Sequence, residues 1–249
     1  MTLQRKTTLT STCVLATAFL VVYAVTQRIL DKGFTNLEFK DVQQRIERAN
    51  AALAEQVNAL DTLCSDWANW DDSYDYAATK NEAFAKATLQ TDSFISAKLD
   101  IIVILDTQQT ALFAQEVDLE TEKASECPAE LLQHMRAEPL NPKDQPDSTV
   151  KGLLLLPKGA LLVAARPILR TDQTGPSRGT LLMGRYLNDA RIEQMENVLL
   201  QKPVFERICQ SSLPDDFSAA YRLLAIGRQQ FTSQSSDEVI AAYTLVRDL

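Results

Sequence analysis

Histidine and glycine are both scarce in this sequence, and each shortage excludes a kind of chemistry. The one histidine, His134, is too few for the histidine-rich sets that hold zinc, and no CxxC pair is present. A Ser-His-Asp hydrolase would have to use that histidine without a GxSxG motif to present the serine. Seven glycines in 249 residues leave no glycine-rich loop to hold the phosphates of a nucleotide. We therefore expect no enzymatic activity, no cofactor and no metal centre.

Cysteine is also sparse, and basic residues are outnumbered by acidic ones. Cys13 lies in an apolar segment, which leaves Cys64, Cys127 and Cys209 for at most one disulfide. The same three residues fit separate buried thiols that behave as small hydrophobic side chains. With 25 Lys and Arg against 33 Asp and Glu the net charge is -8, so we expect no nucleic-acid partner.

One uncharged run near the N-terminus predicts a membrane helix. Residues 7–25, TTLTSTCVLATAFLVVYAV, contain no charge and no proline and approach the roughly 20 residues that a helix needs to cross a bilayer. We predict a transmembrane helix with a cytoplasmic N-terminus, although the basic residues on its two sides nearly balance. A cleaved signal peptide is the alternative. Because a helical pattern follows at once, with no loop for a peptidase, an uncleaved anchor is favoured.

Apolar residues then recur at spacings of three and four, which indicates one face of a long helix. They are Val42, Ile46, Ala49, Leu53, Val57, Leu60, Cys64 and Trp67. We predict a helical stalk over residues 26–64, roughly 60 Å long at 1.5 Å per residue. Residues 39–64 of this stalk are the predicted interface of a parallel homodimer. The repeat drifts between Leu53 and Val57, so a strict coiled coil over the whole length is not expected.

The remainder, residues 65–249, has the pattern of a sensor-like α+β domain. Apolar runs bounded by turns predict two strands, then three strands, then a last strand, with a short helix and a longer helix between them. The predicted strands lie in residues 99–106, 111–117, 151–169, 179–187 and 237–246, and the helices in 127–138 and 188–201. Hairpin-linked strands imply a central antiparallel sheet, and we expect the helices to cover one face of it.

Five segments in this order resemble a CHASE domain of the fourth type, an extracellular sensory module of bacterial and archaeal receptors. They are DWANWDDSYDYA, LDIIVILDTQQTALFAQEV, AARPIL, GRYL and the terminal AAYTLVRDL. The resemblance covers about residues 28–249 and implies a PAS-like or Cache-like fold. It also implies an input role for a histidine kinase or a cyclic-di-GMP enzyme. In the family the last strand usually continues into a second membrane helix and an output module, and the sequence is expected to stop short of both.

The stretch DWANWDDSYDY, residues 66–76, gathers both tryptophans and four aspartates. On one continuous helix, four of its side chains share a face: Trp67, Trp70, Asp71 and Tyr74. One interpretation is packing, in which the rings anchor the stalk on the sheet and Asp71 or Asp72 bonds an indole, a backbone N–H or an arginine. In the other interpretation these side chains line a ligand cavity. Calcium binding by the aspartates is a further alternative, although the DxDxDG loop is missing.

Two arginines interrupt strands that are otherwise apolar, so each must reach the sheet edge or meet an anion. Alternation places Arg166 on the face of Ala164, and Arg185 on the face of Met183. We expect at least one of them to point into a pocket, where it pairs with an aspartate or binds a ligand carboxylate. The predicted ligand-binding residues are therefore Trp67, Trp70, Asp71, Asp72, Tyr74, Arg166 and Arg185.

These patterns together predict a non-enzymatic sensory domain. We expect a single N-terminal span in the inner membrane, a periplasmic or extracellular domain that binds an unknown small molecule, and signalling by displacement of the stalk helix. Two other functions fit the same residues. One is a membrane-tethered scaffold or partner-binding module whose pocket is filled by side chains, and the other is an exported hydrolase with an unrecognised site.

Overall fold

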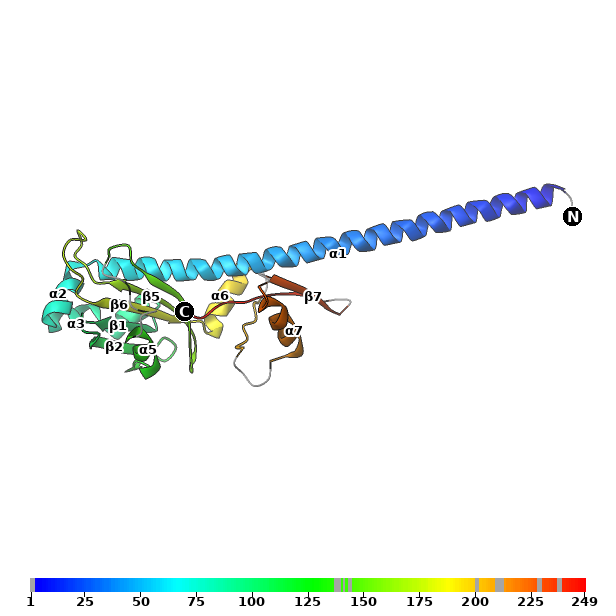
Figure 1. The fold of residues 1–249 in the computed structure, drawn as a ribbon. Helices are drawn as coiled ribbons and strands as arrows, with labels where there is room; N and C mark the ends of the chain where they lie inside the picture. The colour runs from blue at the N-terminus through cyan, green and yellow to red at the C-terminus, as the bar shows by residue number, and fades with distance from the viewer. Residues whose placement is uncertain are drawn as a thin grey trace. The chain divides into compact units, whose positions relative to one another are not determined.

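The chain folds into two compact units. The computed structural model describes residues 3–136, 140, 142, 145–199, 202–208, 213–227, 230–236 and 239–249. One unit comprises Arg48–Phe205 with Val246–Leu249, and the other comprises Met1–Glu47 with Glu206–Leu245. The larger unit contains a six-stranded sheet (Figure 1).

A single long helix, α1 (Leu3–Ala68), opens the chain. It includes both the predicted membrane segment, residues 7–25, and the predicted stalk, residues 26–64. Within the part of the chain that the structure describes, no helix has the combination of length and apolar character that crossing a membrane requires.

Three short helices follow α1: α2 (Asp71–Thr79), α3 (Glu82–Thr88) and α4 (Thr91–Ala97). Local residue chemistry sets their boundaries. The Asn81 side chain accepts a hydrogen bond from the Ala83 N–H at 2.9 Å and so begins α3. Lys80 and Lys98 adopt left-handed backbone conformations that end α2 and α4.

The core of the larger unit is a six-stranded antiparallel sheet. Its strands are β1 (Ile101–Leu105), β2 (Ala111–Asp118), β3 (Lys123–Glu126), β4 (Val150–Leu156), β5 (Gly159–Pro167) and β6 (Thr180–Tyr186). In space the order is β3-β2-β1-β6-β5-β4. Every residue of the central strand β1 is buried, because both faces of the sheet are covered. The predicted α+β class with an antiparallel sheet is confirmed, whereas β3 was not predicted.

Helices pack on both faces of this sheet, so the expectation that they cover one face is wrong. On the first face, Ile102 and Met183 pack in one hydrophobic cluster with Leu60 of α1 and Phe94 of α4. The second face is covered by α5 (Ala129–Arg136), whose Leu131 and Met135 pack with strand residues of the other cluster. Neighbouring residues of a strand point to opposite faces of the sheet. The apolar runs of β1, β5 and β6 therefore provide hydrophobic side chains on both faces.

After β6, the chain forms α6 (Asp189–Leu199), whose Met195 and Leu199 join the first cluster. In the smaller unit, α7 (Asp215–Leu224) accompanies a hairpin of β7 (Gln230–Ser236) and β8 (Val239–Thr244). The predicted last strand corresponds to β8, and positions 237 and 238 of the prediction lie outside the described residues. Neither α7 nor β7 was predicted.

The last four residues return to the larger unit and lie along β4. The Leu249 N–H donates to the Leu153 carbonyl oxygen at 3.1 Å. The Leu155 N–H donates to Asp248 Oδ1 at 3.0 Å. A side chain at Gly152 would come within 2.9 Å of the Leu249 side chain, so the small residue allows this close approach.

Candidate functional site

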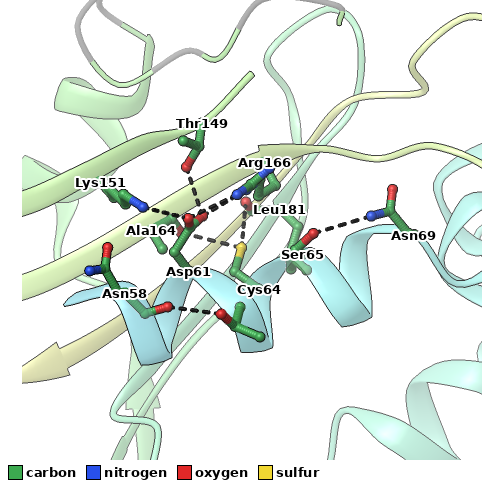
Figure 2. A network of polar contacts seen from close by, with 11 residues as sticks. Asn58, Asp61, Cys64, Ser65, Asn69, Thr149, Lys151, Ala164, Arg166 and Leu181 are labelled. Carbon is green, nitrogen blue, oxygen red and sulfur yellow. Dashed lines mark hydrogen bonds and ion pairs between the residues drawn. The ribbon is translucent and has the colours of Figure 1, made fainter. Parts of the chain in front are cut away.

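A buried aspartate of α1 binds two side chains of the sheet and one that directly precedes β4, as Figure 2 shows. Arg166, near the end of β5, donates from Nε to Asp61 Oδ1 at 2.7 Å and from Nη2 to Oδ2 at 2.8 Å. Thr149 donates its hydroxyl to Oδ1 at 2.8 Å, and Lys151 of β4 donates from Nζ to Oδ2 at 2.8 Å. The guanidinium therefore grips the carboxylate with two parallel bonds, the strongest common geometry for this pair.

The spacing of residues on α1 places Asp61 in this position. Leu53, Leu60, Cys64 and Ala68 are all buried, at intervals of seven, four and four residues, so they form the face of α1 that lies on the sheet. Asp61 follows Leu60 and lies at the margin of that face, where its side chain is only 7% exposed. On the facing strand, Arg166 shares a side with Ala164, as alternation predicted.

Close packing of α1 on the strands continues at Cys64, one turn beyond Asp61. Its thiol sulfur lies 3.4 Å from the Ala164 carbonyl oxygen and 3.5 Å from that of Leu181, and the S–H can donate to either. Burial, and the neighbouring negative charge of Asp61, raise the pKa of this thiol. Neither Cys64 nor Cys127 forms a disulfide bond. The interpretation of Cys64 as a small buried hydrophobic residue therefore fits the structure.

The electrostatics of Asp61 favour its ionised form. Burial acts to raise the pKa of this carboxyl, but the hydrogen bonds from Arg166, Lys151 and Thr149 outweigh it, and the pKa falls to about 2. In turn, the bond to Asp61 raises the pKa of Arg166. The network thus joins α1 to β4 and β5 through an ionised carboxylate and its three hydrogen-bond donors.

The 66–76 stretch does not form one continuous helical face, which corrects the prediction. α1 ends at Ala68, and Trp70 is extended, with φ of -81° and ψ of 136°, immediately before α2 begins. At this break the Leu169 N–H, two residues beyond β5, donates to the Ala68 carbonyl oxygen at 3.0 Å and satisfies the end of α1. Trp67 and Trp70 nevertheless stack, with ring centroids 5.4 Å apart.

Tyr74 and Asp71 of the same stretch hold the loop between β5 and β6. The Tyr74 ring is buried, its hydroxyl donates to the Pro176 carbonyl oxygen at 3.3 Å, and two guanidinium groups lie against the ring. Arg178 is 4.2 Å and Arg170 is 4.7 Å from the ring centroid. Asp71 Oδ1 accepts the Thr171 N–H at 3.1 Å. These contacts fit the packing interpretation of the two residues.

The remaining predicted residues lie in three different surroundings. Arg185 donates to the Lys98 carbonyl oxygen at 3.1 Å and to that of Ala97 at 3.0 Å, where α4 ends and carbonyls lack helical partners. Asp72 is exposed at the start of α2, and Trp70 is 42% exposed. Neither arginine pairs with Asp71 or Asp72, because Arg166 is bound by Asp61 and Arg185 by backbone carbonyls. A ligand-binding role for the seven residues stays a prediction.

Sequence analysis missed Asp61 and Lys151. A signal was present, since Asp61 stands between Leu60 and Cys64, two positions of the predicted apolar face, and a buried carboxylate needs a cationic partner.

The chain is similar to sensory domains of known receptors. A family model described as the CHASE4 domain matches residues 52–204. The methanogenesis regulatory histidine kinase FilI of Methanothrix harundinacea (strain 6Ac) is 26% identical over 159 residues, which cover 64% of this chain and 18% of the kinase. The chain thus spans less than a fifth of that relative.

Two solved structures share the fold, each with a TM-score of 0.52. One is the extracellular domain of vpHK1S-Z8, described as a histidine kinase, at 15% identity, with 79% of this chain and 85% of that one covered. The other is a domain of a sensory box/GGDEF family protein from Vibrio parahaemolyticus, at 12% identity, with 79% and 87% covered. At these identities the likeness concerns the fold alone.

Proposed function

Because the chain belongs to the CHASE4 domain family of sensors, we propose that it is the extracytoplasmic input domain of a membrane-bound signal-transduction receptor. A histidine kinase and a GGDEF protein carry the similar domains, so a kinase or a cyclic-di-GMP enzyme is the output that we propose. The domain itself binds a ligand and catalyses no reaction.

The attachment of α1 to the sheet carries this proposal. Asp61 joins the helix to β4 and β5 through Arg166, Lys151 and Thr149, so a shift of either strand is passed to α1. A ligand changes the balance between two arrangements of α1 only if it binds one of them more tightly. A ligand carboxylate that competes with Asp61 for Arg166 would meet that condition, because it would release the helix.

The predicted aromatic and acidic residues fit a role at the end of this helix. Trp67 and Trp70 stack across the break between α1 and α2. Asp71 and Tyr74 form hydrogen bonds with the loop between β5 and β6. We propose that a ligand bound near these residues would change where α1 ends, since the carbonyl of Ala68, its last residue, is already bonded to the Leu169 N–H.

The coupling proposal predicts an altered output when Asp61 loses its charge. We expect a receptor in which this chain replaces the CHASE4 segment of a family histidine kinase to change its autophosphorylation by about threefold or more with Asp61→Asn. A threefold change corresponds to about 0.7 kcal/mol between the two arrangements of α1. The measurement is phosphate incorporation in isolated membranes, with Glu38→Gln, at an exposed position of α1 outside residues 39–64, as the matched variant. Equal rates for wild type and Asp61→Asn, with both folded, would contradict helix coupling.

We also propose a parallel homodimer along residues 39–64 of α1. Leu53, Leu60 and Cys64 pack against the chain's own sheet, so the interface has to use other residues of this segment. Single cysteines placed through residues 39–64 should trap dimers at positions three or four residues apart. Gel electrophoresis after oxidation checks this, with Lys86→Cys on α3 as a control outside α1. If no position traps a dimer, the result argues against the stalk interface.

A further inference from the structure

A small cavity opens at one end of the sheet, away from the Asp61 network. It has a volume of about 190 Å³ and lies where β1 begins, β2 ends, β4 turns into β5 and β6 ends. Its polar lining consists of Asp100, Asp118, Glu120, Lys158, Tyr186 and Asn188. No residue of the predicted ligand set takes part.

Asp100 is a buried carboxylate that is only half satisfied. The residue is 5% exposed, and its Oδ2 accepts both the Tyr186 N–H at 2.9 Å and Arg191 Nη2 at 3.1 Å. No described residue donates a hydrogen bond to the other oxygen, Oδ1. Burial raises the pKa of this carboxyl, and the two donors oppose the rise without cancelling it. A further donor with positive charge would therefore stabilise the ionised form.

Tyr186 also lines the cavity, and it carries an unsatisfied group of its own. The residue is 8% exposed, and its buried hydroxyl has no hydrogen-bond partner among the described residues. Such groups are rare in folded proteins, because an unpaired buried hydroxyl loses its hydrogen bonds to water without replacement.

Two carboxylates at the rim of the cavity, Asp118 and Glu120, lie outside the ion pairs of this region. Lys158 is paired with Glu116, and its Nζ lies 4.9 Å from the centroid of the Tyr186 ring. Arg191 is paired with Asp100. Among the described residues, no cation forms an ion pair with Asp118 or with Glu120, and both are exposed at the rim. The field in the cavity therefore attracts a cation and repels an anion.

We propose that this cavity binds a small organic amine, whose ammonium group donates to Asp100 Oδ1 and lies within the field of Asp118 and Glu120. An ammonium offers three donors, and a volume of 190 Å³ equals the liquid volume of about six water molecules, so the ligand has about six non-hydrogen atoms. A metal ion fits less well, because no three His, Cys, Asp or Glu residues of the described part of the chain gather as metal ligands. Any signalling by this amine rests on the function proposed above, whereas its binding does not.

Binding is tested with the full chain and three compounds of matched size: 4-aminobutan-1-ol, butane-1,4-diol and 4-hydroxybutanoate. We expect the amine alone to raise the melting temperature, in proportion to ln(1 + [L]/Kd), at constant ionic strength. Glu120→Lys, at an exposed position, should weaken the amine about tenfold in calorimetry without affecting folding, because it reverses a charge at the rim. Asp100→Asn should abolish binding. Glu193→Gln, an exposed change on α6, is the matched control and should bind as wild type.

Three results would overturn the proposal. They are no thermal shift with the amine, an equal shift with the neutral diol, or an affinity that Glu120→Lys leaves unchanged. A stronger shift with calcium chloride than with the amine would also overturn it, since it would assign the cavity to a metal ion. Amine binding that leaves the kinase output unchanged would keep the site and remove only its signalling role.

Discussion

Asp61→Ala is expected to lower the free energy of unfolding by about 3 kcal/mol, because it leaves Arg166 with a buried charge and no partner. The Arg166 side chain is 17% exposed, so water cannot replace the two hydrogen bonds that the carboxylate accepts. Lys151, at 34% exposure, recovers part of its hydration and contributes less to the loss. Denaturation in urea at neutral pH gives the measurement.

Acid should remove the same interaction from the wild-type protein. The folded-state pKa of Asp61, about 2, lies below the ordinary value of 3.8, so the ionised network stabilises the fold above about pH 4 and is lost as the pH falls toward 2. The stability difference between wild type and Asp61→Asn should therefore shrink by about 2 kcal/mol over this range.

Two variants separate this effect from a general sensitivity of α1. Asp41 pairs with Arg45 on the same helix at 2.7 Å, the distance of the Asp61–Arg166 pair, but the two side chains are 50% and 44% exposed. Asp41→Ala is therefore expected to change stability by less than about 0.5 kcal/mol. The double variant Asp61→Leu with Arg166→Met should be more stable than Asp61→Ala, because the guanidinium is gone and the charge that still lacks Asp61, that of Lys151, is 34% exposed. Equal losses for Asp41→Ala and Asp61→Ala would refute the buried network.

Gly179→Ala is expected to destabilise the protein by more than about 3 kcal/mol, since the position combines an unfavourable backbone conformation with a backbone collision. Gly179 has φ of +135°, and an added Cβ would lie 1.9 Å from the Leu105 carbonyl oxygen. That oxygen belongs to β1, at the centre of the sheet, so it cannot move as the end of a flexible side chain would. Thermal unfolding followed by circular dichroism measures the loss.

Gly175 in the same loop provides the matched comparison. Its φ is +84°, and the nearest atom to an added Cβ would be the Tyr74 hydroxyl oxygen at 3.4 Å, an ordinary contact. Gly175→Ala should therefore cost only the left-handed conformation, about 1 kcal/mol. If both variants lose the same stability, the collision with β1 is not real.

The sheet was largely predictable because its signals are local. Apolar runs and turn residues predicted strands in 99–106 and 111–117, and the structure forms β1 and β2 at Ile101–Leu105 and Ala111–Asp118. β3, with the sequence KASE, is short and wholly exposed, so it carries no apolar pattern to detect. Similarly, β7 reads QFTSQSS, in which a single aromatic residue gives little evidence of a strand.

The candidate site was less predictable because its contacts are distant in sequence. Asp61 binds Thr149, Lys151 and Arg166, which lie 88, 90 and 105 positions away. No spacing rule joins residues over such separations. The break at Trp70 has the same origin, since a backbone N–H of Leu169 ends α1 although the local pattern of apolar residues continues.

The return of the last residues to β4 also bears on aggregation. A sheet with an open edge offers unpaired N–H and C=O groups to a strand of another molecule. Here Leu249 and Asp248 satisfy the outward backbone groups of Leu153 and Leu155 on one edge. At the other edge, β3 is four residues long and begins and ends with a charge, Lys123 and Glu126. Growth of this sheet into fibrils is therefore discouraged at both edges.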